Sequence, residues 1–157
     1  MIQAFRGTYV GGSANTFYLN TYDKYEDKDN IEYKPILTFT NQMTGSSINL
    51  VAHTYDYTNK DRYVKITFVI KDVNPIPGSG SIDIGNKNYP FGFYDVIIRE
   101  NTTDYLPSES SILSRPIVYT GLMNLRASVT GGYENPAVEY TEYTTNDSDT
   151  ESVYITN

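Results

Sequence analysis

The sequence predicts an all-β protein, an antiparallel β-sandwich of Ig-like or jelly-roll-like type with extended arms at both ends. Composition is the first reason, because 24 Ile and Val residues stand against 12 Ala and Leu residues, and 16 Tyr and 18 Thr accompany them. Branched and aromatic side chains pack well on a pleated sheet and are less favourable in a helix. The second reason is an alternation of apolar and polar residues, and the third is the regular spacing of turn residues between the alternating runs.

The clearest alternating run covers residues 62–70, where the apolar residues at every second position are separated by the polar Lys65 and Thr67. A period of two residues is typical of a strand that buries one face and exposes the other. The apolar face of this strand is predicted to hold Val64, Ile66, Phe68 and Ile70.

Further strands are predicted, in chain order, at residues 17–22, 36–41, 47–57, 91–99 and 117–127, with a short edge strand at 81–84. Turn residues separate them: a hairpin is expected at 44–46, another at 58–61, and a longer loop at 75–80, where two prolines and two glycines interrupt strand pairing. No helical stripe is visible, and residues 103–113 could hold at most one short turn.

Charge and polarity divide the chain into three parts. Residues 1–31 form an N-terminal arm or first strand followed by a polar loop, residues 32–129 form the sandwich, and residues 130–157 form an acidic C-terminal segment ending in a short strand. All 12 basic residues lie at or before Arg126, whereas residues 127–157 hold six acidic residues and no basic one. The acidic stretch 146–151 is too polar to fold alone. The strand after it is expected to dock on its own domain or on a neighbour, and a last strand of the same sandwich is the alternative.

Interaction through these two ends is the functional hypothesis that the sequence supports, because an extended segment can add a strand to an exposed sheet edge. The candidate residues are the apolar side chains of the two arms. They are Met1, Phe5, Tyr9, Val138, Tyr140, Tyr143, Val153, Tyr154 and Ile155.

Catalytic motifs are missing from the sequence, so we expect no enzyme activity and no cofactor. The chain has no Cys and a single His, His53, which rules out a thiolate site and a His-based metal cluster. It has neither a Gly-x-Ser-x-Gly elbow nor a phosphate-binding glycine pattern. His53 is expected to be an ordinary solvent-facing or sheet-neighbouring residue. A net charge of −7 predicts no direct nucleic-acid binding, and the sequence shows neither a membrane span nor a secretory signal.

The high tyrosine content leaves a second hypothesis open, a carbohydrate-binding module or adhesin domain. Tyrosine combines a large contact area with a polar tip, which suits interfaces and sugar stacking. An exposed cluster is expected among Tyr55, Tyr57, Tyr63, Tyr140 and Tyr143. The absence of Trp weighs against sugar binding, and most of these tyrosines also serve as ordinary strand formers.

A strand that ends in a polar loop, Tyr94-Asp95-Val96-Ile97-Ile98-Arg99-Glu100-Asn101, is followed by a returning strand, Val118-Tyr119-Thr120-Gly121-Leu122-Met123-Asn124-Leu125. With the polar tail after it, this layout resembles small β-sandwich virion proteins of tailed bacteriophages, including marine and crAss-like phages. The resemblance covers residues 63–157.

It implies a non-enzymatic structural protein of the virion, most simply a capsid decoration or head-fibre component, with a neck or tail adaptor as the alternative. The implied partners are the major capsid protein or the portal, neck and tail proteins, and a homo-oligomer is expected. An acidic surface is repelled by packaged DNA, which favours the exterior of the capsid or the neck and tail.

Overall fold

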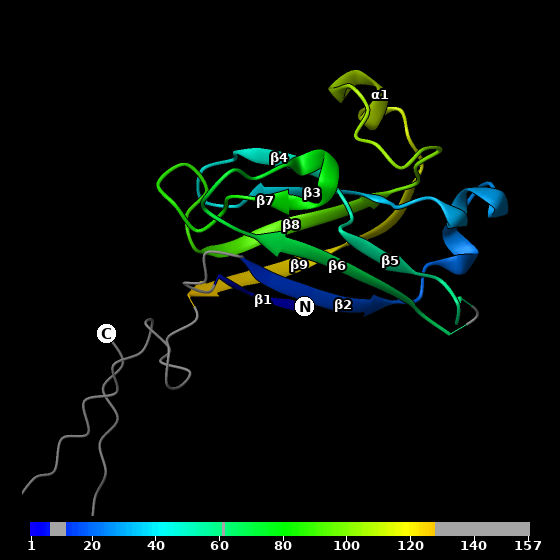
Figure 1. Cartoon of the computed structure of the whole chain (residues 1–157), viewed down its shortest axis with the longest axis horizontal. Helices are drawn as coiled ribbons and strands as arrows, with labels where there is room; N and C mark the ends of the chain where they lie inside the picture. The colour runs from blue at the N-terminus through cyan, green and yellow to red at the C-terminus, as the bar shows by residue number, and fades with distance from the viewer. Residues whose placement is uncertain (7–11, 61, 128–157) are drawn as a thin grey trace, which may run out of the picture.

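Two β-sheets packed face to face form the body of the protein, and the all-β sandwich is confirmed (Figure 1). The computed structural model describes residues 1–6, 12–60 and 62–127. One sheet has five strands in the order β1-β9-β8-β3-β4, and the other has the order β2-β6-β5 with β7 also paired to β6. The choice between Ig-like and jelly-roll-like connections stays a prediction.

The five-stranded sheet consists of β1 (Ile2–Arg6), β3 (Ile36–Asn41), β4 (Ser47–Val51), β8 (Gly92–Arg99) and β9 (Ile117–Ala127). The second sheet consists of β2 (Ser13–Leu19), β5 (Thr54–Asp56), β6 (Val64–Ile70) and β7 (Ser81–Ile82). Three short 3-10 helices, η1 (Tyr22–Lys24), η2 (Lys28–Glu32) and η3 (Pro77–Ser79), and one short α-helix, α1 (Glu109–Leu113), lie in the connections.

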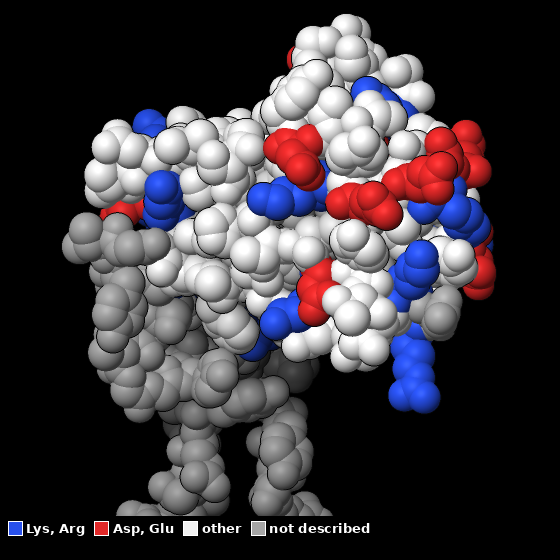
Figure 2. Space-filling view, turned by 45° about the vertical axis from the view of Figure 1, so that its right-hand side comes forward, with Lys and Arg blue, Asp and Glu red and all other residues white. Residues whose placement is uncertain are grey.

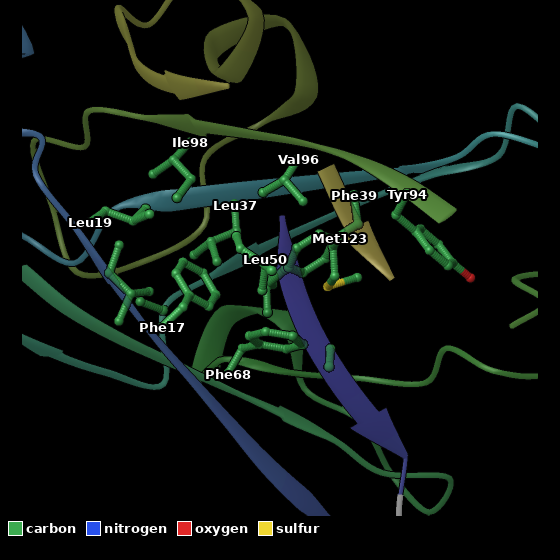
Figure 3. Packing of buried hydrophobic residues seen from close by; sticks show 14 of the residues in the cluster. Phe17, Leu19, Leu37, Phe39, Leu50, Phe68, Tyr94, Val96, Ile98 and Met123 are labelled. Carbon is green, nitrogen blue, oxygen red and sulfur yellow. The ribbon is translucent and has the colours of Figure 1, made fainter. Parts of the chain in front are cut away.

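The core lies between the two sheets, and alternation along each strand fills it (Figure 3). The four predicted apolar positions of β6 are all buried, as the two-residue period requires. Phe68 lies at the centre, with its ring centroid 4.9 Å from that of Phe39 and 6.0 Å from that of Phe17. Aromatic rings from both sheets therefore interlock across the sandwich.

The single strand predicted at 47–57 is wrong, because the chain crosses from one sheet to the other in its middle. The N–H of Ala52 donates to the carbonyl of Pro35 (3.0 Å), beside the five-stranded sheet. The N–H of the next residue, His53, donates to the carbonyl of Thr67 (2.8 Å) in the other sheet. Ala52 is buried, and the crossing joins two edge strands, because β4 ends the strand order of one sheet and β5 ends that of the other. β4 and β5 consequently belong to different sheets.

Of the two alternatives for residues 1–31, an N-terminal arm or a first strand, the described part of this segment contains strands: β1 pairs with β9 of the five-stranded sheet, and β2 pairs with β6 of the second sheet. Strands on both sides of the boundary predicted at residue 32 therefore pair with each other. The strand predicted at 17–22 is β2, which begins and ends earlier, at Ser13–Leu19. The sandwich is also not purely antiparallel, since β1–β9 and β6–β7 are parallel pairs.

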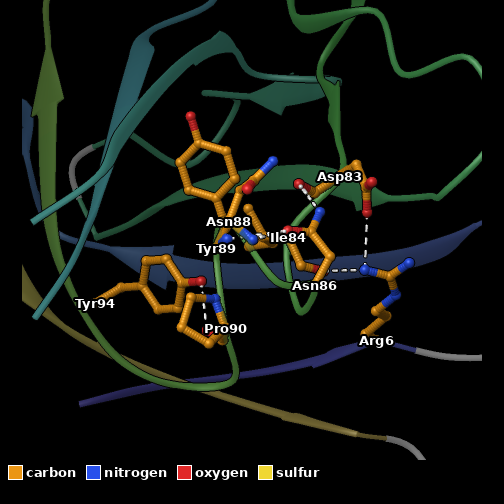
Figure 4. A network of polar contacts seen from close by, with 8 residues as sticks. All are labelled: Arg6, Asp83, Ile84, Asn86, Asn88, Tyr89, Pro90 and Tyr94. Carbon is orange, nitrogen blue, oxygen red and sulfur yellow. Dashed lines mark hydrogen bonds and ion pairs between the residues drawn. The ribbon is translucent and has the colours of Figure 1, made fainter. Parts of the chain in front are cut away.

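Side chains tie the N-terminal strand to the rest of the sandwich. Asn15 of β2 accepts from the N–H of Phe5 (2.7 Å) through Oδ1 and donates to the carbonyl of Phe5 (3.0 Å) through Nδ2. Arg6 Nη1 pairs with Asp83 Oδ1 (2.8 Å) and donates to the carbonyl of Ile84 (2.7 Å), as Figure 4 shows. The turn that follows is closed by Asn86, whose Oδ1 accepts from two backbone N–H groups. These contacts join β1 of the five-stranded sheet to β2 of the second sheet and to the segment after β7.

Candidate functional site

The connection between β8 and β9 forms a projection that we call the α1 lobe, residues 100–116. Figure 1 shows α1 standing clear of the two sheets, and Figure 2 shows that the top of the molecule is mainly uncharged. Three apolar side chains are largely exposed here, with Tyr105 at 66%, Leu113 at 69% and Ile117, the first residue of β9, at 49%. Long ordered loops on a rigid scaffold are frequent carriers of function.

Three consecutive polar residues, Arg99, Glu100 and Asn101, are buried at the base of the α1 lobe. Strand alternation cannot bury successive side chains, and the pairing of β8 with β9 shifts register between Ile98 and Arg99. This irregularity ends the alternation where the lobe begins. Because buried polar groups need hydrogen-bond partners, each of these three side chains either holds a neighbouring segment in place through its hydrogen bonds or lacks a partner that it needs.

Asn101 anchors the start of the lobe and has no exposed surface. Its Nδ2 donates to the carbonyls of Lys34 and Tyr105, both at 3.2 Å, and its Oδ1 accepts from the N–H of Thr102 (3.0 Å). A further bond joins the Lys34 N–H to Asp104 Oδ1 (3.1 Å). The lobe is therefore fastened to the chain just before β3.

Glu100 fastens a second segment, the connection that holds η1 and η2. Its Oε1 accepts from the N–H of Glu26, and its Oε2 accepts from Asn30 Nδ2 (3.0 Å). Its own N–H donates to the carbonyl of Pro116 (3.0 Å), which closes the neck of the lobe. One buried carboxylate thus positions two neighbouring loops at the same end of the sandwich.

Arg99 differs from its two neighbours because it is left without an adequate partner. The residue is only 7% exposed, and Nη1 donates to Thr38 Oγ1 at a long 3.3 Å. Nε is buried and has no acceptor. The loss of water around the guanidinium lowers the pKa of Arg99. Within residues 1–6, 12–60 and 62–127 no carboxylate pairs with it, since the ion pair found there joins Arg6 and Asp83.

Some buried apolar residues at the lobe end of the five-stranded sheet lie outside the main core. Ile36 and Val51 are in register with each other, and Ile36 is also in register with Arg99. Both are buried yet lie outside the main cluster, as does Ile112 of α1. Ile112 is thus the buried side chain of α1, whereas Leu113 beside it is exposed.

The outer face of the second sheet is another exposed surface. Tyr18 and Tyr63 meet edge to face, with ring centroids 5.3 Å apart, and are 59% and 38% exposed. Next to them Thr16 Oγ1 and Thr67 Oγ1 are hydrogen-bonded (2.8 Å). An open hollow of about 200 Å³ lies further along, lined by His53, Val69, Lys71, Ile76, Ser79 and Ser81.

His53 lies in the crossing between β4 and β5 and is exposed; its Nδ1 lies 3.0 Å from the Ser79 carbonyl. An exposed cluster was expected among Tyr55, Tyr57, Tyr63, Tyr140 and Tyr143, but Tyr55 and Tyr57 pack against the main core, and Tyr140 and Tyr143 lie outside the described residues. Tyr55 Oη instead lies 3.2 Å from Tyr25 Oη, and burial raises the pKa of Tyr25 to about 12 and raises the pKa of Tyr55 as well.

Of the nine residues expected to make interactions, the structure describes two. Met1 is exposed beside β1, whereas Phe5 lies within β1 and is half-buried. Tyr9, Val138, Tyr140, Tyr143, Val153, Tyr154 and Ile155 lie outside the described residues. Sequence reasoning missed the α1 lobe; the signal that could have found it is the 17-residue gap between two well-predicted strands, which exceeds an ordinary hairpin.

Comparison with protein-family models, with curated proteins and with solved structures found no match for this chain. In the part of the chain that the structure describes, no group of three or more His, Cys, Asp or Glu residues could hold a metal ion. No helix in that part has the length and apolarity needed to cross a membrane.

Proposed function

We propose that this protein is a non-enzymatic structural component of a tailed-phage virion that acts by protein–protein contact. The observation that carries the proposal is the α1 lobe, where Tyr105 and Leu113 are exposed on a base fixed by Asn101, together with the exposed Ile117 at the start of β9. A pre-organised apolar projection loses little conformational entropy on docking, which favours binding to a protein surface. The resemblance of the β8–β9 hairpin and its loop to phage virion proteins supplies the context.

A capsid decoration or head-fibre role is the first placement, and a neck or tail adaptor is the alternative. Quantitative mass spectrometry of purified particles, with the major capsid protein as internal standard, separates the two. Abundance comparable with the capsid protein supports decoration, whereas a few copies per particle support the neck, tail or vertex fibres. A particle without this protein would refute the virion role.

The lobe itself is tested by a charge placed on its apolar tip. Leu113→Asp should prevent incorporation into particles, because docking would bury an unpaired carboxylate. Met43→Asp is the matched control, since Met43 is 80% exposed in the turn between β3 and β4, away from the lobe. Equal incorporation of both variants would show that the lobe is not the docking surface.

A carbohydrate-binding module is the second candidate, favoured by the exposed Tyr18–Tyr63 pair beside hydroxyl groups on a flat sheet face. Aromatic faces with adjacent polar groups suit sugar rings. On a glycan array, Tyr18→Ala should abolish binding, while Tyr105→Ala on the α1 lobe should leave it intact. No binding by the unaltered protein would exclude this candidate.

A further inference from the structure

The outer face of the second sheet is one continuous surface, because the residues of β2, β5 and β6 that alternate with the core residues all point to it. The Tyr18–Tyr63 pair lies at one end of this face, and the hollow lined by Val69 and Lys71 lies at the other. Tyr63 and Val69 are six positions apart, so the strand separates them by about 20 Å. This length suits a chain of several units better than one small molecule.

A row of threonines joins the two ends of this face. Thr16, Thr67 and Thr54 are neighbours across β2, β6 and β5, in register with one another. The hydroxyl oxygens of Thr16 and Thr67 lie 2.8 Å apart, and Thr16 and Thr54 are exposed. Short side chains leave room above the sheet, and their hydroxyl groups both donate and accept hydrogen bonds, as the hydroxyl groups of a sugar do.

Two polar side chains of the hollow can bind a ligand. His53 Nδ1 lies 3.0 Å from the carbonyl oxygen of Ser79, and since a carbonyl only accepts, Nδ1 carries the proton. In the neutral ring Nε2 is then an acceptor for a hydroxyl group. Lys71 makes no ion pair in the described part of the chain, where the ion pair joins Arg6 and Asp83.

Apolar walls complete the hollow. Val69 and Ile76 line it, and Ile76 is 54% exposed. Its volume of about 200 Å³ is below the roughly 300–1,000 Å³ of pockets for drug-sized ligands, so it suits a single ring. A sugar ring that carries a carboxylate matches this lining: its C–H groups pack on the walls, one hydroxyl donates to His53, and the carboxylate accepts from the Lys71 ammonium.

The charges of this face favour an acidic ligand. Lys65 is in register with Asp56, which offsets its charge, whereas the residues that line the hollow with Lys71 include no acidic one. The protein as a whole has a net charge of −7, so its overall charge repels a polyanion. Binding of a polyanion would therefore report a local site and not a general attraction.

We propose that the outer face of the second sheet binds an acidic polysaccharide. One carboxylate-bearing sugar ring lies in the hollow against Lys71 and His53, and the sugars that follow it cross the threonine row to the Tyr18–Tyr63 pair. The proposal rests on the second candidate function, the carbohydrate-binding module, and deepens it by naming the class of sugar. It is independent of the virion role and of the α1 lobe.

Biolayer interferometry with immobilised polygalacturonate, alginate, hyaluronate and polysialic acid gives the first test. The unaltered full-length protein should bind at least one of these polymers. The fully methyl-esterified form of that polymer should bind at least about tenfold more weakly, because the charge-assisted hydrogen bond to the carboxylate is lost. This comparison uses the unaltered protein, so it stays decisive whatever a substitution does to the fold.

Substitutions at the two ends of the face should have different effects. Lys71→Met should weaken binding of the acidic polymer by about tenfold or more and should leave binding of its methyl ester unchanged. Tyr18→Ala should weaken binding of both forms, because an aromatic ring packs on a sugar ring whether or not that sugar is charged. Lys87→Met is the matched control, since it removes an exposed positive charge outside the lining of the hollow and should leave binding unchanged.

Three results would overturn the proposal: no binding of any of the four acidic polymers, equal binding of the acid and its ester, and normal binding by Lys71→Met. Poly-glutamate bound as tightly as the polysaccharide would overturn it as well, because the hollow would then recognise acidic peptides. A neutral glycan bound through Tyr18, with no acidic polymer bound, would overturn this inference and leave the carbohydrate-binding candidate standing. The absence of binding to neutral and acidic glycans alike would remove both.

Discussion

Asn101→Asp changes the side-chain amide at the base of the α1 lobe to a carboxylate and should destabilise the protein strongly. The amide nitrogen that donates to the carbonyls of Lys34 and Tyr105 becomes a carboxylate oxygen. Two hydrogen bonds of about 1 kcal/mol each are lost, and two carbonyl oxygens then face a buried negative charge. We expect the free energy of unfolding at pH 7 to fall by about 3 kcal/mol, which corresponds to about 10 °C in melting temperature.

Urea unfolding of Asn101→Asp and of the control Asn88→Asp measures this difference. Asn88 is exposed, and within the described residues only its backbone N–H makes a hydrogen bond, so the control should lie within about 0.5 kcal/mol of the unaltered protein. Burial raises the pKa of the carboxyl group that the Asn101→Asp substitution introduces, so lowering the pH protonates that group and restores one donor. The deficit of the variant should therefore shrink as the pH falls towards 4.

Amide hydrogen exchange locates the loss. The N–H of Glu100 donates to the carbonyl of Pro116 at the neck of the lobe and should exchange much faster in the variant, because the lost bonds to Lys34 and Tyr105 no longer hold the lobe closed, while the N–H groups of β6 should keep the protection set by global unfolding. The reasoning would be refuted if Asn101→Asp were no less stable than Asn88→Asp. Equal loss of protection in β6 and in the lobe would instead place the lobe inside the main cooperative unit.

Three further outcomes are expected. Phe68→Ala should lower the free energy of unfolding by about 3–5 kcal/mol in urea, because it opens a cavity between the sheets, while the half-exposed Phe93→Ala should cost less than about 1 kcal/mol. Gly80→Ala should be more destabilising than Gly45→Ala in thermal melts: both have a positive φ, but a Cβ at Gly80 would lie 2.2 Å from the backbone N of His53 whereas Gly45 has open space. In a spectrophotometric titration Tyr25 should ionise near pH 12, above the ordinary tyrosine pKa of 10. Because the pKa of Tyr25 is raised in the folded state, the stability that it contributes is complete below pH 10 and is lost as the pH rises towards 12. Ionisation near pH 10 in the folded protein would contradict the burial of Tyr25.

The strands with strict alternation were readable from the sequence. β3 and β9 have the predicted bounds, and β6 begins two residues later than predicted. These strands could be predicted because the buried face of a half-buried strand appears in the sequence as apolar residues at every second position. The crossing at Ala52 was not readable, since Ile48, Leu50 and Tyr55 all pack against the same core from two different sheets. An apolar pattern indicates that side chains are buried, but it does not indicate which of the two sheets a strand belongs to.

The candidate site was largely hidden for a related reason. Arg99, Glu100 and Asn101 look like the polar start of a surface loop, and only their partners in three distant segments, through Thr38, Asn30 and the carbonyl of Lys34, bury them. Hydrogen bonds between residues about 60–70 positions apart leave no periodic trace. The parallel pairing of β1 with β9 was hidden in the same way, because one short apolar strand fits several sheet edges.

The pairing of β1 with β9 also determines the order in which the strands can pair during synthesis. Ile2 is in register with Met123, so the five-stranded sheet cannot be completed until nearly all of the described chain has been made. β2 and β6 can pair much earlier, once Ile70 is available. At about 5–20 residues per second, β1 waits roughly 6–24 s for its partner strand on the ribosome.

Before β9 is made, β1 can instead contact Asn15 of β2. Asn15 follows Phe5 by only ten residues and bonds both polar groups of its backbone, so this contact can form long before β9 exists. This amide side chain bonds the backbone of β1 as a neighbouring strand would, before the five-stranded sheet is complete. It would keep the earliest-made strand from pairing with other nascent chains, a hazard that grows when many copies are produced at once.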